Sequence, residues 1–111
     1  MGFDLFGEKA KSVEGEYFRN NVWGWRPLAE YVLSVCELQH GEEWSWNNGY
    51  KVSAKNALYI ADVLDKELSS GGTEKYARAY ARRKVKDYPF SVENVREFAR
   101  FARASGGFTI C

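Results

Sequence analysis

Apolar residues recur at the spacing of an α-helix in four segments of the chain. In the clearest segment, residues 54–69, apolar side chains return every third or fourth residue and so line one face of a helix. Polar residues occupy the positions between them. The same spacing recurs in three further segments, and we expect helices over residues 27–38, 54–69, 74–86 and 92–104.

Residues at the ends of these segments support the helices. Pro27 suits a first helical turn, where its missing N–H removes no hydrogen bond. Ser53, Thr73 and Ser91 each precede a periodic segment, and their hydroxyls are typical N-caps. Glycine pairs at 71–72 and 106–107 are expected to end the second and fourth helices.

Short apolar stretches bounded by glycine lie at both ends of the chain. Residues 2–6 and 107–111 are too short for helices, and we expect two strands that pair with each other. Residues 44–52 alternate around Asn48-Gly49, a pair that tolerates positive φ, and predict a hairpin beside these strands. The expected fold is one α+β domain over residues 1–111, mostly α, with a minimal antiparallel sheet.

The composition is that of a folded protein with little net charge. Of 111 residues, 45% are hydrophobic and 16% aromatic, and the net charge is +1. No overall field therefore draws the chain to nucleic acid or to a membrane. The charge is uneven, however: residues 1–70 carry 7 Lys and Arg against 11 Asp and Glu, and residues 71–111 carry 9 against 4. Two solvated faces of opposite sign or a basic, partner-facing patch would both explain this.

The two cysteines, Cys36 and Cys111, are too few for a disulfide scaffold. Cys36 occupies an apolar helical position, so we expect a buried thiol. His40 is the only histidine, and we expect no metal and no cofactor. Neither a signal-peptide pattern nor an apolar run of membrane-spanning length occurs, so a cytoplasmic protein with no membrane contact is expected.

Residues 16–28 combine four aromatic residues, two arginines and two asparagines. Exposed aromatic and arginine side chains are frequent hot spots, so this stretch and the turn at 44–50 predict the surface of a non-enzymatic accessory protein that binds another protein. An exposed aromatic patch would also favour a homodimer. In the alternative interpretation the aromatics are core, the asparagines cap a turn and the first arginine pairs with a carboxylate. The candidate binding residues are Arg19, Asn20, Asn21, Trp23, Trp25, Arg26, Trp46, Asn48 and Tyr50.

Two other functions remain open from the sequence. Cations on the expected helices 74–86 and 92–104 could contact phosphates, which makes nucleic-acid binding the first alternative. An enzyme of unrecognised type is the second, and it would need a polar pocket around Arg19, Asn20 and His40. No Ser-His-Asp or Cys-His set indicates catalytic residues. The candidate nucleic-acid residues are Lys75, Arg78, Arg82, Arg83, Lys86, Arg100 and Arg103.

Several motifs carry a resemblance that reaches both ends of the chain. They are MGFD at 1–4, GEYFRNNVW at 15–23, WRPL at 25–28, YPFSVENVREF at 88–98, SGGF at 105–108 and IC at 110–111. Together they resemble a family of small uncharacterised proteins of phages and bacteria, and the resemblance implies no activity. Longer members carry a Cys-x-x-Cys zinc insertion before the Tyr-Pro-Phe segment, which this chain lacks. Tyr50 also stands where relatives are expected to have histidine, so no zinc-dependent or catalytic role is transferred.

Overall fold

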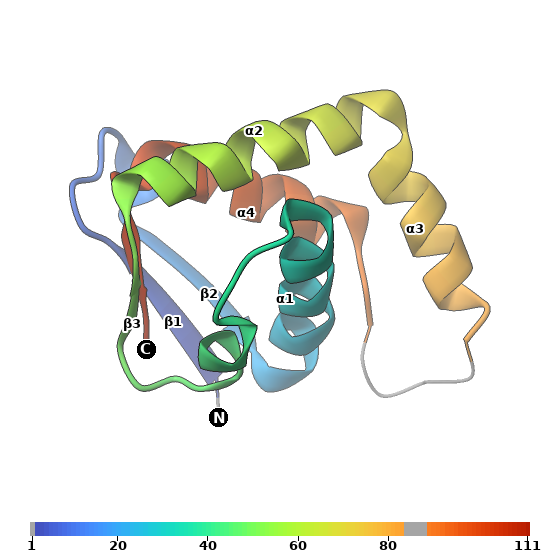
Figure 1. Ribbon diagram of the computed structural model, residues 1–111, viewed down its shortest axis with the longest axis horizontal. Coiled ribbons are helices and arrows are strands. Elements are labelled where there is room, and N and C mark those ends of the chain that lie inside the picture. Colours follow the sequence, from blue (N-terminus) through green and yellow to red (C-terminus); the bar gives the residue numbers. More distant parts are fainter. Residues whose placement is uncertain (1, 84–88) are drawn as a thin grey trace.

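The computed structural model describes residues 2–83 and 89–111 (Figure 1). These residues form four α-helices, four β-strands and two short 3-10 helices, so the fold is α+β and mostly α, as the sequence predicts. In chain order the elements are β1 (Gly2–Gly7), η1 (Val13–Gly15), β2 (Tyr17–Asn21), α1 (Val22–Cys36), η2 (Gly41–Ser45), β3 (Tyr50–Val52), α2 (Ala54–Ser70), α3 (Gly72–Ala81), α4 (Val92–Ser105) and β4 (Phe108–Ile110).

The four strands form one antiparallel sheet in the order β2-β1-β4-β3. The expected pairing of the two terminal strands is confirmed, because Leu5 of β1 lies opposite Ile110 of β4. Asp4 and Cys111 extend this pairing with two backbone N–H···O hydrogen bonds of 2.9 and 2.7 Å. The strand nearest the C-terminus therefore lies inside the sheet, between β1 and β3.

Helices cover one face of this sheet, and the other face is open. On β1, Phe3 and Leu5 are buried, whereas Phe6, the residue after Leu5, is 47% exposed. Its partner on β2, Tyr17, is 49% exposed on the same open face. Phe18 and Phe108 point the other way and pack against the aromatic rings of α4. Val52 and Ile110 are also buried in the core.

Trp25 on α1 lies at the centre of the core and is fully buried. Its indole is stacked between Phe3 of β1 and Trp44 of η2, with ring centres 5.3 and 5.8 Å away. The indole N–H donates a 2.8 Å hydrogen bond to the backbone carbonyl of Trp44. Phe98 of α4 meets the same ring edge-on at 6.1 Å. One side chain thus joins a strand, two α-helices and a 3-10 helix.

The helix predicted over residues 27–38 begins five residues earlier than expected, and it ends at Cys36. Asn21 is the N-cap, since its side chain accepts a 2.8 Å hydrogen bond from the N–H of Gly24. Pro27 consequently lies inside the helix and not at its first position. Pro27 is buried there, on a helix whose apolar residues Leu28, Tyr31 and Val32 pack in the core.

The hairpin predicted over residues 44–52 is wrong. Residues 41–45 form η2, and only Tyr50–Val52 form a strand, which pairs with β4 and not with the preceding residues. Trp44 does not lie in a strand, because its side chain packs against Trp25 and Phe108 in the core. Gly49 does take a positive φ of 97°, but its N–H bonds to the carbonyl of Ile110 across the sheet.

The third helix also differs from its prediction. It begins at Gly72, and Thr73 is not an N-cap but a buried residue of the first turn. The Thr73 hydroxyl shares a 2.8 Å hydrogen bond with the hydroxyl of Tyr31, which explains why a polar side chain is tolerated there. The helix ends at Ala81, and the predicted positions 84–86 lie outside the described residues. Ser53 and Ser91 do cap α2 and α4 as predicted.

We expect Trp25→Ala to lower the free energy of unfolding by about 3–5 kcal/mol, because it removes a fully buried indole and its hydrogen bond. Trp23→Ala is the matched control, because Trp23 lies on the same helix but is 49% exposed. Its effect should stay near 1 kcal/mol or less. Urea unfolding monitored by circular dichroism measures both values, and equal losses would show that the stack is not central to the core.

Candidate functional site

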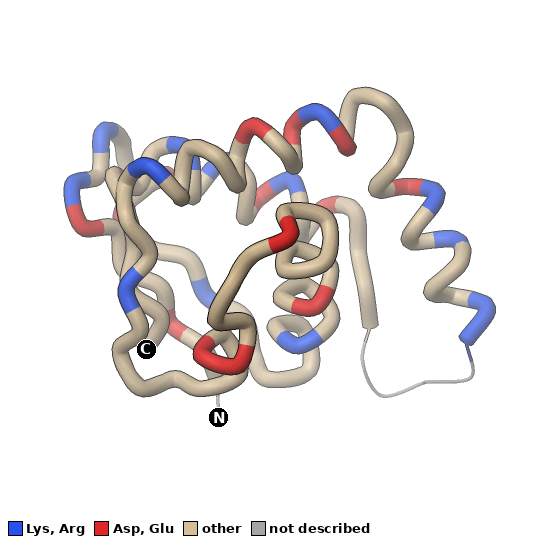
Figure 2. The backbone as a smooth tube through the Cα atoms, viewed as in Figure 1, with Lys and Arg blue, Asp and Glu red and all other residues tan. Residues whose placement is uncertain are grey.

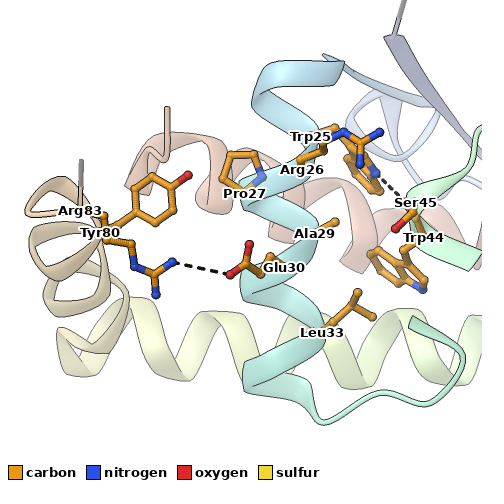
Figure 3. A pocket seen from close by; sticks show the side chains of 10 residues that line it. All are labelled: Trp25, Arg26, Pro27, Ala29, Glu30, Leu33, Trp44, Ser45, Tyr80 and Arg83. Carbon is orange, nitrogen blue, oxygen red and sulfur yellow. Dashed lines mark hydrogen bonds and ion pairs between the residues drawn. The ribbon is translucent and has the colours of Figure 1, made fainter. Parts of the chain in front are cut away.

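A groove of about 450 Å³ crosses the outer side of α1 between η2 and the C-terminal end of α3 (Figure 3). Its volume lies within the range of roughly 300–1,000 Å³ that is usual for ligand pockets. Leu33 and Ala29 supply apolar surface from α1, and the ring of Tyr80 on α3 lies at the opposite end from Trp44 and Ser45. Three segments that are distant in sequence therefore build one concave surface.

Three charged side chains lie along this groove. Arg26 is exposed and makes no ion pair with any described residue. Glu30 and Arg83 face each other with 3.7 Å between carboxylate oxygen and guanidinium nitrogen, and both are more than half exposed. The Arg83 guanidinium also lies 5.3 Å from the ring centre of Tyr80. Two cations and one carboxylate give the groove a positive balance, which favours an acidic ligand.

The groove uses both stretches that the sequence analysis singled out, but only in part. Trp25 and Arg26 come from the first stretch, and Trp44 and Ser45 belong to the second. Trp25 contributes as a buried wall and not as an exposed contact. Glu30, Leu33 and Tyr80 also line the groove, although the sequence pattern did not indicate them as site residues. Because α1 begins at Val22, Arg26, Glu30 and Leu33 lie along one side of it at i, i+4 and i+7. This spacing could have been found in the sequence if the helix had been predicted to begin at Val22.

Four other candidates meet at a separate, open hollow of about 520 Å³ beside the start of α1. Arg19, Asn20, Asn21 and Trp23 line it together with residues at the start of α4. Asn20 and Asn94 exchange two amide hydrogen bonds there, of 3.1 and 2.7 Å. Asn21 serves as the cap of α1. Both asparagines thus have structural roles, but neither caps a turn as the alternative interpretation expects.

Arg19 belongs to a polar network on the open face of the sheet. It lies directly opposite Asp4 in the strand register, and its guanidinium donates to the Asp4 carboxylate at 2.8 Å. The Tyr17 hydroxyl donates to the same carboxylate oxygen. These two hydrogen bonds, that of Tyr17 first, hold the pKa of Asp4 below its ordinary value. The predicted pairing of Arg19 with a carboxylate is confirmed.

The remaining candidates of the second stretch do not join the groove. Trp46 is 60% exposed and Asn48 is exposed, both in the loop that leads to β3. Tyr50 is half-buried and lines a third cavity of about 340 Å³, which also contains His40. Arg19 and Asn20 line the hollow and His40 lines this cavity, so the polar pocket that the enzyme hypothesis requires does not bring these three residues together.

Several of the described cations of the nucleic-acid alternative form ion pairs with neighbouring carboxylates. Figure 2 shows where the charged residues lie along the backbone. Arg78 pairs with Glu74 at 3.1 Å, and Arg83 pairs with Glu30. Arg103 donates to two carboxylates of α2, those of Asp62 and Asp65, at 2.7 and 2.8 Å. Lys86 lies outside the described residues. Lys75, Arg82 and Arg100 are exposed and have no ion pair within the described part of the chain.

Three common clues to function are a membrane-spanning helix, a metal-binding cluster and a similar known protein. No described helix combines the length and apolarity that crossing a bilayer requires. Within residues 2–83 and 89–111, no three His, Cys, Asp or Glu side chains gather where they could hold a metal ion. No known protein family, curated protein or solved structure matches the chain. Fold and groove alone define its class, that of a small α+β protein with an open groove of ligand size.

Acid is expected to remove the stabilisation that Asp4 contributes. The folded pKa of Asp4 lies below 3.8, its ordinary value, so the stabilisation is fully present above that value and is lost as the pH falls through the folded pKa. Wild type should lose unfolding free energy more steeply than Asp4→Asn between about pH 5 and pH 2. Urea unfolding across this range measures the slopes. Equal slopes in the two proteins would show that the Asp4 carboxylate does not stabilise the fold.

The two thiols should differ in reactivity. Burial raises the pKa of the Cys36 thiol to about 12, whereas Cys111 is only half-buried. Since the thiolate is the reactive form, only about one Cys36 in ten thousand would be ionised at pH 8. We expect iodoacetamide to label Cys111 in native protein and both residues in denaturant, as read by peptide mass spectrometry. Rapid native labelling of Cys36 would contradict its burial.

Proposed function

We propose that this protein is a non-enzymatic accessory protein whose α1 groove binds a short acidic, amphipathic segment of another protein. The observation that carries the proposal is the juxtaposition of an apolar surface, formed by Leu33, Ala29 and Tyr80, with Arg26, which has no described ion-pair partner. An apolar side chain of the ligand would fill the groove, and a carboxylate would bind the guanidinium of Arg26.

Protein fits this groove better than nucleic acid does. Glu30 stands between the two arginines and is more than half exposed, so it would repel a phosphate backbone. A peptide can place its carboxylate beside Arg26 and an apolar group near Glu30, which avoids that repulsion. The described lining residues include one carboxylate and no histidine or cysteine, so the proposal assigns binding and not catalysis to the groove.

A random-peptide phage library selected on the wild-type protein tests the proposal. We expect selected peptides to combine acidic with apolar or aromatic residues. Arg26→Glu should weaken their binding about tenfold, or about 1.4 kcal/mol, in fluorescence anisotropy. Arg100→Glu is the matched charge control, since Arg100 is also exposed and lacks a described ion pair but lies on α4 outside the groove.

A second pair of variants locates the binding surface. Leu33→Arg should abolish binding by filling the groove, whereas Leu58→Arg, at a 41% exposed leucine on α2, should leave it unchanged. Circular dichroism confirms that both variants fold. Equal binding by wild type and Leu33→Arg would rule out the groove, and equal binding by Arg26→Glu would rule out the preference for acidic ligands.

A further inference from the structure

A single residue, Gly71, separates α2 from α3. It ends the first helix and precedes the second, with φ 87° and ψ 3°. This left-handed conformation turns the chain, so that α3 descends from the end of α2 (Figure 1). A Cβ added at Gly71 would meet no other atom within 4 Å. Glycine is therefore required at this turn for its backbone angles and not for lack of room for a side chain.

The turn divides the chain into two complementary parts. The first part, residues 1–70, contains β1, β2, α1, β3 and α2, and the second, residues 72–111, contains α3, α4 and β4. The second part inserts β4 between β1 and β3 of the first. The charges are complementary too, with a net −4 before Gly71 and +5 from Gly71 onwards, from the counts of Lys and Arg against Asp and Glu. Arg103 of the second part forms ion pairs with Asp62 and Asp65 of the first part.

We propose that the chain forms an exchanged dimer in which residues 72–111 of each copy pack on residues 1–70 of the other. Gly71 adopts helical angles, and α2 and α3 join into one helix over residues 54–81. The contacts between the two parts that lie away from Gly71 are then kept, but between copies. The binding groove becomes shared, because Tyr80 and Arg83 come from one copy and Arg26, Glu30 and Leu33 from the other.

The position of β4 sets the rate of exchange. Phe108 and Ile110 are fully buried, and β4 has a hydrogen-bonded neighbour on both sides. The second part cannot leave without breaking the sheet, so monomer and dimer should interconvert only through extensive unfolding. Dimer is expected to form during refolding at high protein concentration and to persist after dilution.

Gly71→Ala tests the hinge. Alanine is strained in the left-handed conformation and relaxed in a helix, which favours the open form by about tenfold per chain and the dimer by about a hundredfold. Gly49→Ala is the matched control, because Gly49 has φ 97° and equally open surroundings but does not connect two helices. Both variants are refolded at the same concentration and analysed by size-exclusion chromatography with light scattering. More dimer in Gly71→Ala than in Gly49→Ala supports the proposal, and monomer in both, or equal dimer in both, overturns it.

A charge-exchange experiment identifies which residues pack between copies. In the Gly71→Ala background, one chain carries Arg103→Asp and the other carries Asp62→Arg with Asp65→Arg. In each homodimer, position 103 then has the same charge as positions 62 and 65 of the partner copy. In an exchanged heterodimer, both contacts between position 103 and positions 62 and 65 join opposite charges. Co-refolding should give more heterodimer than the statistical half in native mass spectrometry. A statistical mixture would show that the copies meet on other surfaces and would overturn the exchange.

Discussion

The burial of one indole, that of Trp25, organises the structure. Its ring lies between Phe3 and Trp44, and its N–H reaches the Trp44 carbonyl. A buried indole N–H without an acceptor is costly, so the stack and the hydrogen bond together select the position of η2. The next residue, Arg26, is exposed as a consequence, since consecutive helical residues point in different directions. The core contact and the candidate ligand contact are thus two results of one helix orientation.

Polar side chains that face inward account for two differences between the expected and the observed fold, the unexpected strand β2 and the start of α3. Asn20 interrupts the alternation of apolar and polar residues in β2, so this strand was not predicted. Its amide forms two hydrogen bonds with Asn94, which lies on a helix far away in the sequence. Thr73 resembles a cap in the sequence, but its partner is the Tyr31 hydroxyl. Such residues can be placed only when their partners are known, because their burial depends on a hydrogen bond between distant segments.

Features of the fold that depend on residues close together in the sequence were predicted correctly. The serine caps at 53 and 91 and the apolar faces of α2 and α4 follow from residues within a few positions of each other. The open sheet face and the groove do not, because they depend on which elements pack together. Phe6 and Trp44 are both aromatic residues near glycine in the sequence, yet one is 47% exposed and the other 2% exposed. Exposure of aromatic residues, and with it the candidate site, is therefore a property of the assembled fold.

The interior place of β4 has a consequence for synthesis on the ribosome. Until residues 108–110 emerge, β1 and β3 have no strand between them, and the apolar side of the sheet, including Leu5 and Val52, lacks the cover of Phe108. The nascent chain therefore exposes an unpaired edge of β1 and of β3 until β4 has been synthesised and inserted between them.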